Sequence, residues 1–337
     1  MTGNGRPNLR QIADELGLSV TTVSRALKDG PEVRPETIER VKVAAKAAGY
    51  VPNPHGRALR TGQTRTLTAI LPMETRDYLS DIAKLPLIEG LTLGAQEHGY
   101  GLTVYSTTPE EDPEDNLAKL VQAGSADGVV ITRMVRDDPR IPYLEARKTP
   151  FIAFGRCDGG HNHAYVDIDN EGIAYEATRL LFERGARRIA LQSLKPEDQY
   201  SVARATGYAR AHADAGRDMD SNLIGREELT MEAAEAWLDR LLDLPNAPDA
   251  LVCANELGLL GALSTLRRRQ LAPGRDFHIA VRDSTHLCRY LSAPLITHSV
   301  DMVEVGRKLV DGLVQRVENP DWPPMRIVLR GALGFID

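Results

Sequence analysis

The feature that most constrains the fold is the alternation of short apolar runs with amphipathic helical patterns from residue 66 onward. Strand–helix alternation of this kind is typical of parallel sheets covered by helices on both faces. The predicted strands are TLTAILP (66–72), GLTVYST (101–107), DGVVIT (127–132), PFIAFG (150–155), RRIALQ (187–192), DALVCA (249–254) and HIAVR (278–282), and the clearest helical patterns cover 171–184, 202–215, 232–242 and 256–270. So many units favour two α/β lobes. A small ligand is expected in the cleft between them, beyond the strand C-termini.

The first 50 residues carry a different pattern, made of three short helices. Asn8 and Gln11 are spaced as a capping box, and Gly17 ends the helix that follows. Ser19 can cap a second helix, and Pro35 opens a third. The predicted inward side chains are Ile12, Ala13, Leu16, Val23, Ala26, Leu27, Ile38, Val41, Ala45 and Ala48. Two helices joined by so tight a glycine-containing turn form a helix-turn-helix.

Charge is divided unevenly along the chain. Residues 1–65 hold 11 Lys and Arg residues against six acids, a balance of +5, whereas the remainder carries 30 basic and 41 acidic residues, a balance of −11. A small basic part attached to a larger acidic one favours nucleic-acid binding, because clustered Lys and Arg neutralise phosphates and release counterions. Charge alone leaves chance clustering on a solvated face as the alternative.

Composition excludes several classes of protein. The 337 residues include 42% hydrophobic and 26% charged ones, which is ordinary for a globular chain. The sequence has no run of 18 apolar residues and no apolar stretch at its start, which argues against a membrane span and a secretory signal. Cys157, Cys253 and Cys288 are odd in number and widely spaced. They fit reduced thiols in a cytoplasm better than disulfides or a zinc site.

The second helix of a helix-turn-helix enters the major groove with its N-terminal turn against the base edges. Val20 is suited to a thymine methyl group, and Arg25, one turn further, can bind guanine through two hydrogen bonds. Small hydroxyls beside them are placed to bind phosphates. The predicted set comprises Val20, Thr21 and Arg25 as base readers, Thr22 and Ser24 as phosphate donors, and the capping Ser19. Any of these could also be an ordinary surface residue.

Taken in order, these motifs resemble one family. The segment IADELGLSVTTVSRALKDGPEVRPETIERVKVAAKAAGYVPNPHGRALRTGQTRTLTAILP is similar to the headpiece and linker of the lac repressor/galactose repressor family of bacterial transcription regulators, and weaker similarity continues to the C-terminus. The resemblance implies a headpiece over 1–50, a hinge segment over 51–65 and a two-lobed, periplasmic-binding-protein-like sensor over 66–337. The implied N-lobe comprises about 66–166 and 298–323, and the C-lobe about 167–297 and 324–337.

The hinge contains the stretch NPHGRALRTG (53–62), which is too short and too poor in apolar side chains to fold as an isolated helix. In the family, the corresponding segments of two subunits fold side by side on the operator, and a leucine enters the minor groove. The resemblance implies this role for Leu59, at an unstacking cost of roughly a few kcal/mol. Arg57 and Arg60 are expected on nearby phosphates or groove edges, and Asn53 completes the predicted set.

Candidate effector-binding residues also follow from the resemblance. Arg204 in SVARATGY, Asn255 after LVCA, and Asp283 match family positions at the sensor cleft. These residue types suit a polyol, because planar donors and carboxylate acceptors pair with vicinal hydroxyls. The stretch VRDS (281–284) stands where GFDD is usual, so that Arg282 replaces an aromatic residue that often lines the pocket. This departure weakens the transfer of any particular sugar.

Three further stretches, TRMVRDDPRIPYL, FGR and HNHAYVDIDNEG, are similar to family members that respond to α-glucosides. They add Arg133, Arg156 and Asp169 as secondary pocket candidates and favour a disaccharide such as sucrose or another glucoside as effector. Salt-bridged loop ends are the alternative interpretation of each pocket residue. The two histidines of HNH have no supporting ligand set, so no metal or cofactor is expected.

The sequence thus predicts a repressor of sugar-related genes, a cytoplasmic homodimer that binds a near-palindromic double-stranded operator and responds to a small sugar between its lobes. The terminal RGALGFID carries no apolar heptad tail, which favours a dimer over a tail-linked tetramer. A purine or a partner protein could replace the sugar. A solute-transport binding protein would instead have a secretory signal and no basic headpiece. An enzyme is the weakest alternative, because no nucleophile–base set is recognisable.

Overall fold

The computed structural model describes residues 7–50, 63–73, 82, 84–108, 110–157, 160, 162–228 and 230–337. The chain divides into two compact units, residues 1–64 and 65–337, and each has its own hydrophobic core. No helix in these described ranges is long and apolar enough to cross a bilayer. Most of the predicted hinge lies outside them, including four predicted DNA-binding residues, Asn53, Arg57, Leu59 and Arg60.

The described part of the headpiece consists of the helices α1 (Leu9–Leu16), α2 (Val20–Ala26) and α3 (Pro35–Ala47). The predicted capping box begins α1: the Gln11 N–H donates to the Asn8 side chain at 3.0 Å, and the Asn8 N–H donates to the Gln11 side chain at 2.9 Å. Gly17 follows with a φ of 65°, a left-handed conformation that lets the chain turn directly toward α2. Local signals thus place two helices that are too short to be stable alone.

The three helices pack around a small core. Its buried side chains are Ile12, Ala13, Val23, Ala26, Val41, Ala44 and Ala45, with Leu16, Leu27 and Ile38 at the edge. The predicted stripe on α3 is wrong at one position, because Ala44 is buried whereas Ala48 is exposed. α3 ends at Ala47 and Ala48 is its C-cap, so Ala48 lies outside the helical stripe.

The described residues of the sensor form two six-stranded sheets, one in each lobe. The N-lobe sheet has the order β11-β5-β4-β3-β1-β2, and its neighbouring strands are all parallel. The C-lobe sheet has the order β12-β10-β9-β8-β6-β7, with β12 antiparallel to β10 and the other pairs parallel. The strands are β1 (Thr66–Ile70), β2 (Gly101–Tyr105), β3 (Gly128–Thr132), β4 (Phe151–Phe154), β5 (Tyr165–Ile168), β6 (Ile189–Gln192), β7 (Ile224–Gly225), β8 (Ala250–Cys253), β9 (His278–Asp283), β10 (Leu295–Ser299), β11 (Arg326–Leu329) and β12 (Ala332–Ile336).

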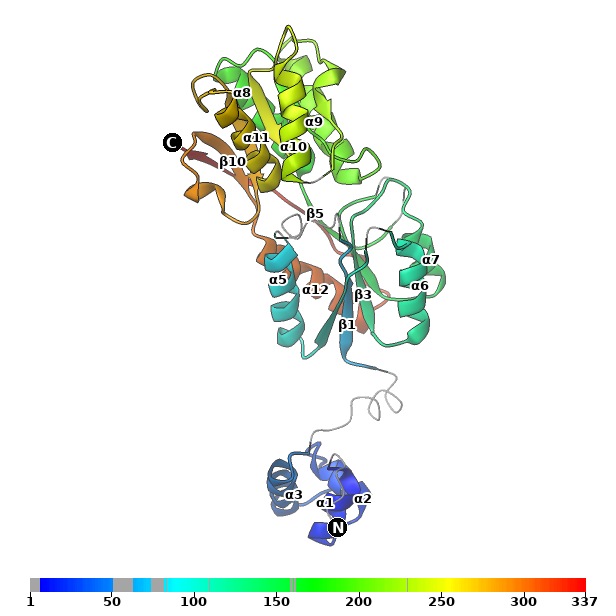
Figure 1. Ribbon diagram of the computed structural model, residues 1–337. Coiled ribbons are helices and arrows are strands. Elements are labelled where there is room, and N and C mark those ends of the chain that lie inside the picture. The colour runs from blue at the N-terminus through cyan, green and yellow to red at the C-terminus, as the bar shows by residue number, and fades with distance from the viewer. Residues whose placement is uncertain are drawn as a thin grey trace. The chain divides into compact units, whose positions relative to one another are not determined.

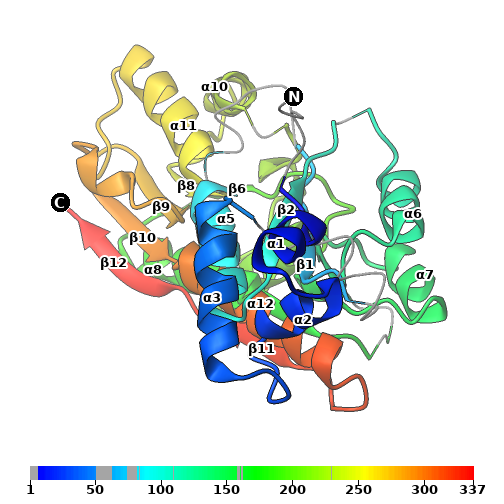
Figure 2. The same ribbon diagram turned by 90° about the horizontal axis from the view of Figure 1, so that it is seen from below.

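Helices cover both faces of each sheet. In the N-lobe, α5 and α12 lie on one face and α6 and α7 on the other (Figures 1 and 2). In the C-lobe, Leu251 of β8 packs toward α10 and α11, whereas its neighbours Ala250 and Val252 pack toward α8 and α9. The helices are α5 (Lys84–Glu97), α6 (Pro113–Ala123), α7 (Arg140–Ala146), α8 (Asn170–Glu183), α9 (Gln199–Asp214), α10 (Met231–Leu242), α11 (Glu256–Arg268) and α12 (Met302–Glu318).

The described chain passes between the lobes three times, after β5, after β10 and after β11. The first two crossings lie within a few residues of the boundaries predicted at 166/167 and 297/298. The boundary predicted at 323/324 is wrong, because β11 pairs with β5 of the N-lobe and the crossing falls at 330–331. The proline-containing turn after Trp322 therefore connects α12 to an edge strand of the same lobe.

Five strands were not predicted from the sequence, namely β5, β7, β10, β11 and β12. Asp167 interrupts the apolar pattern of β5, and Thr297 and His298 interrupt that of β10. β11 and β12 alternate exposed and half-buried residues without a long apolar run. These strands form because partner strands pair with them, which a local pattern does not show.

Candidate functional site

The N-terminal turn of α2 presents exposed side chains. Val20 is 43% exposed, and Thr21 and Arg25 are exposed as well. Val23 and Ala26, on the other side of the helix, belong to the headpiece core. Helix periodicity therefore separates the predicted base readers from the core residues. Thr22 and Ser24, predicted to bind phosphates, are half-buried.

Ser19 caps α2, as predicted, in addition to its predicted contact with DNA. Its Oγ accepts a hydrogen bond from the Thr22 N–H at 3.0 Å and thereby caps α2. The hydroxyls of Ser19 and Thr22 are also hydrogen-bonded to each other at 2.8 Å. A hydroxyl offers one donor and two acceptor positions, so these contacts orient the turn without using all of its hydrogen-bonding capacity.

Arg25 forms an ion pair with Glu32, which lies between α2 and α3. The Nε–Oε1 distance is 3.2 Å, and the two side chains are 57% and 47% exposed. An exposed pair of this kind contributes about 0–1 kcal/mol. A bidentate contact with guanine discriminates by about 1–3 kcal/mol, so DNA can displace Glu32 from Arg25.

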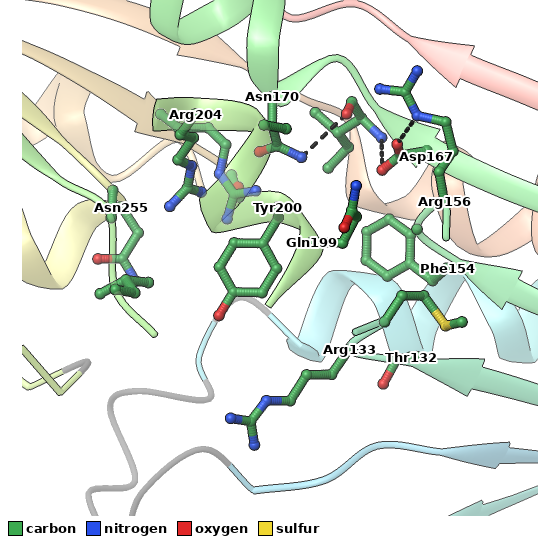
Figure 3. Close-up of a pocket in the computed structure, with 18 of the residues that line it drawn as sticks. Thr132, Arg133, Phe154, Arg156, Asp167, Asn170, Gln199, Tyr200, Arg204 and Asn255 are labelled. Carbon is green, nitrogen blue, oxygen red and sulfur yellow. Dashed lines mark hydrogen bonds and ion pairs between the residues drawn. The ribbon is translucent and has the colours of Figure 1, made fainter. Parts of the chain in front are cut away.

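A cavity of about 460 Å³ lies between the two lobes of the sensor. Residues at the C-terminal ends of β3, β4 and β5 line its N-lobe side, and residues after β8, near the end of β9 and in α9 line its C-lobe side. Figure 3 shows Tyr200 between Arg204 and Asn255 on one side and Phe154 on the other. Ends of parallel strands meet at one edge of a sheet, so two facing sheets bring these loops together.

On the N-lobe side, Arg156 and Asp167 form an ion pair with an Nε–Oδ2 distance of 2.6 Å (Figure 3). Asp167 also accepts a hydrogen bond from the Ile168 N–H at 2.8 Å. Burial raises the pKa of Asp167, although the charge of Arg156 opposes the rise. Burial acts to lower the pKa of Arg156, but the charge of Asp167 and its hydrogen bond, with smaller contributions from Tyr165 and Asp169, together raise it. The pair fixes the guanidinium of Arg156 at the cavity wall.

On the C-lobe side, Arg204 of α9 and Arg282 of β9 line the cavity. Within the described part of the chain, Nη1 of Arg204 and Nε of Arg282 are buried and have no hydrogen-bond partner. Burial lowers the pKa of Arg204 to about 9, and the neighbouring charge of Arg282 adds to this effect. Burial also lowers the pKa of Arg282. The Arg204 guanidinium lies 5.3 Å from the ring centre of Tyr200, within the range of a cation–π contact.

Two segments from opposite lobes are in contact beside the cavity. Arg133 of the N-lobe forms an ion pair with Asp198 of the C-lobe, with an Nε–Oδ1 distance of 3.1 Å, and the Asp198 side chain is 1% exposed. The Tyr200 hydroxyl donates to the other carboxylate oxygen of Asp198 at 2.9 Å. The Gln199 N–H donates to the Met134 carbonyl at 2.9 Å. These contacts couple the cavity lining directly to the arrangement of the lobes.

Two family descriptions match successive parts of the chain. Residues 8–53 match "Bacterial regulatory proteins, lacI family", and residues 64–321 match "Periplasmic binding proteins and sugar binding domain of LacI family". The chain belongs to the lacI family of bacterial regulators. The predicted combination of a helix-turn-helix headpiece and a two-lobed α/β sensor is confirmed, and this lacI-family protein is a DNA-binding transcriptional regulator rather than an enzyme.

Proteins described as transcriptional regulators match this chain over nearly their full length. The HTH-type transcriptional regulator AglR of Rhizobium meliloti (strain 1021) is 33% identical, with 97% of this chain and 94% of that protein covered. CelR of Thermobifida fusca is 30% identical, with 96% of each covered. A solved CelR–cellobiose complex has a TM-score of 0.74 at 28% identity and 98% coverage of both chains. The lac repressor dimer bound to operator has a TM-score of 0.85 at 19% identity, with 98% of both chains covered, and shares the fold.

Four of the six predicted effector-binding residues of this lacI-family regulator line the cavity, namely Arg133, Arg156, Arg204 and Asn255. The Asn255 Oδ1 accepts a hydrogen bond from the Gly258 N–H at 3.0 Å and caps α11. Its amide N–H groups are the part that can face a ligand.

Asp169 and Asp283 do not line the cavity, contrary to the prediction. Asp169 caps α8 by accepting a hydrogen bond from the Gly172 N–H at 2.9 Å. Asp283 is 4% exposed and lies near Glu256; burial first, and then the charge of Glu256, raise its pKa. Side chains alternate across a strand, so the neighbouring Arg282 lines the cavity instead.

Several lining residues were missed because the resemblance identified single positions. Tyr200 lies one turn before Arg204 in α9, so helix periodicity would have been a usable signal. Asp167 and Asn170 flank the end of β5, a strand that the local pattern did not reveal. Among the residues that the structure describes, no group of three or more side chains is arranged to hold a metal ion.

Proposed function

We propose that this lacI-family regulator is a cytoplasmic homodimer that represses genes for sugar use, and that a sugar bound between its lobes changes its affinity for a near-palindromic operator. The observation that carries the proposal is the interlobe cavity of about 460 Å³. Its wall combines guanidinium and amide groups with the aromatic rings of Phe154 and Tyr200. Such a wall offers directional hydrogen bonds to hydroxyls and an apolar face to a sugar ring.

The position of the cavity supports a switching role. A ligand that contacts both lobes stabilises the arrangement in which both contacts are made, and it changes operator affinity only through its different affinity for the two arrangements. The ion pair between Arg133 and Asp198 and the hydrogen bond from Tyr200 to Asp198 stabilise one such arrangement. In a dimer, the arrangement of the lobes would set the spacing of the two DNA-contacting helices.

The comparisons support the partners in this proposal. One similar solved structure is described as a complex with cellobiose, which favours a disaccharide-sized ligand for this chain. Another is described as a dimer bound to operator, which favours a homodimer on a two-part site. The exposed side chains of Val20, Thr21 and Arg25 would then read one half of that site.

The test begins with DNA fragments selected by the full-length protein from a random pool. Binding of a selected fragment is measured by gel shift with neutral and acidic mono- and disaccharides, and with adenine as a non-sugar probe. We expect sequence-selective binding that at least one sugar changes. Failure of the folded protein to select any sequence would contradict the DNA-binding part, and a response to adenine without a response to any sugar would contradict the effector part.

Two variants serve as matched controls in this assay. Arg25→Ala is expected to weaken sequence-selective DNA binding and keep its sugar affinity, because Arg25 lies in the headpiece. Arg204→Ala is expected to keep DNA binding and lose the sugar response, because Arg204 lines the cavity. If neither variant separated the two activities, the assignment of the two sites would be wrong.

A further inference from the structure

Arg204 and Arg282 form a positively charged wall on the C-lobe side of the cavity. Arg204 is 6% exposed, and the two charges lie close enough for Arg282 to disfavour the charged form of Arg204. Among the described residues, neither guanidinium forms an ion pair, and one buried nitrogen of each has no hydrogen-bond partner. Two like charges are therefore brought together at the cavity wall, one buried and the other half-buried.

Other charged residues at the cavity form ion pairs, and Lys84 donates a hydrogen bond to the Pro72 carbonyl. Arg156 is paired with Asp167, and Arg133 with Asp198. Glu171, which also lines the cavity, is paired with Arg210 of α9. Among the described residues, Arg204 and Arg282 are thus the two arginines of the cavity wall that form no ion pair.

Glu256 is the acid whose charge Arg282 experiences, but it is committed to another task. Its Oε1 accepts hydrogen bonds from the N–H groups of Ser284 and Thr285 at 2.5 and 2.7 Å and from the Thr285 hydroxyl at 3.0 Å. Glu256 therefore holds the loop that follows β9. Among the described residues it forms no ion pair with Arg282, and its charge offsets only part of the effect of burial on the pKa of Arg282.

A buried charge without a partner costs free energy, and a second like charge beside it increases that cost. The lowered pKa values of Arg204 and Arg282 reflect this cost. A neutral sugar hydroxyl accepts a hydrogen bond from one arginine but leaves the repulsion between the two in place. An anionic oxygen group accepts hydrogen bonds from both planar donor sets and removes the repulsion as well.

We infer that the effector of this regulator is an acidic carbohydrate whose carboxylate or phosphate group binds between Arg204 and Arg282. The inference rests on the proposed function and narrows its sugar to an anionic one. An inorganic anion alone would leave most of the cavity of about 460 Å³ unfilled. Phe154 and Tyr200, with the amides of Asn170 and Asn255, supply the surface for a sugar ring and its hydroxyls.

Calorimetric titration of the full-length protein with matched ligands tests the inference. Cellobiose is compared with cellobionate, and glucose with glucuronate and glucose 6-phosphate, so that size is nearly constant while charge changes. We expect the acids that carry the accepted anionic group, carboxylate or phosphate, to bind on the order of 10- to 100-fold more tightly than their neutral partners. This is the range for charge-assisted hydrogen bonds. The carboxylate and phosphate members identify which anionic group the wall accepts, and inorganic phosphate measures the contribution of the ion alone.

Three variants locate the effect. Arg282→Gln and Arg204→Gln are expected to reduce the preference for the acid to less than about threefold, because each leaves a single guanidinium. Arg289→Gln, which changes an exposed arginine outside the cavity, should keep the full preference. Arg282→Gln should also raise the melting temperature of the ligand-free sensor, because it removes one of two like charges. This measurement shows that the variant is folded.

Each outcome decides the inference. Equal binding of acidic and neutral partners, or no binding of any acidic probe, would overturn it. Binding of inorganic phosphate as tight as that of the acidic sugars would overturn its carbohydrate part. If a neutral sugar bound and changed operator affinity while its acid did not, the inference would fail and the proposed function would stand. If no sugar of either kind changed operator affinity, the proposed sugar response would fail too.

Discussion

The DNA-contacting turn of α2 and the interlobe cavity both depend on arginine, but they hold it in opposite settings. Arg25 is more than half exposed and pairs with Glu32, whereas Arg204 is 6% exposed and has no acidic partner among the described residues. An exposed guanidinium costs little free energy to maintain, and a buried one is costly until a counter-charge arrives. The headpiece surface is therefore suited to many phosphates, and the cavity to one kind of ligand.

The two regions also differ in how far apart in sequence their contacts lie. The turn of α2 is oriented by Gly17, Ser19 and Thr22, which are close neighbours in the chain. The cavity is assembled from strands β3, β4, β5, β8 and β9 and from helix α9. We therefore expect substitutions in the first region to affect DNA binding alone, and substitutions in the second to affect the effector response or the sensor alone.

Arg25→Ala is expected to have the largest effect. It removes the contact predicted with guanine, and specific binding to a selected DNA fragment should weaken by about 1–3 kcal/mol. Non-specific binding should change much less, because a single charge is lost from a basic headpiece. Fluorescence anisotropy with selected and scrambled fragments measures both. Unchanged sequence preference would remove Arg25 from the base-reading set.

Asp198→Asn should change effector affinity and leave DNA binding by the headpiece unchanged. The variant keeps a hydrogen-bond acceptor but loses the charge that attracts Arg133 across the lobes, so effector affinity should fall by about 1 kcal/mol. Titration of whichever sugar is active measures the loss. Asp239→Asn is the matched control, since it breaks exposed ion pairs with Arg268 and Arg269. A similar loss in both variants would show that lobe contact is not the cause.

Asp283→Asn tests whether this buried acid affects the stability of the sensor without affecting effector binding. Burial and the charge of Glu256 raise the pKa of Asp283, so the folded sensor binds this proton more tightly than the unfolded chain. The resulting stability is present at low pH and is lost as the pH rises through the raised pKa. The variant should therefore be more stable than the wild type at pH 7, with unchanged effector affinity. Urea unfolding at several pH values checks this, and an advantage that grows toward pH 4 would contradict it.

Glu32→Gln should produce the smallest change. It removes a carboxylate that competes with DNA for Arg25, and DNA affinity should rise by about 0.5 kcal/mol or less, because the pair is exposed. Anisotropy titrations at low salt give the best resolution, since screening weakens the effect. A decrease in specific affinity would show instead that Glu32 orients Arg25 toward the bases.

The fold class and the headpiece were predictable because their signals are local. The capping box at Asn8, the left-handed Gly17 and the cap at Ser19 each act within a few residues, and the structure contains all three. Seven strands and four helices of the sensor were predicted from runs long enough to show their period, and each has a counterpart in the structure. Strands such as β5 and β11 were missed because their stability comes from pairing with distant segments.

The sequence by itself determined the two-part organisation of this regulator, the exposed face of α2 and four of the residues on the cavity wall. The tertiary structure alone decided which side of β9 meets the cavity. Its alternation turns Asp283 toward Glu256 and Arg282 toward the ligand space. It also decided that Arg204 and Arg282 line the same cavity and form no ion pair among the described residues. Local sequence specifies which side chains a segment carries, whereas the register and packing of distant strands determine which of them meet.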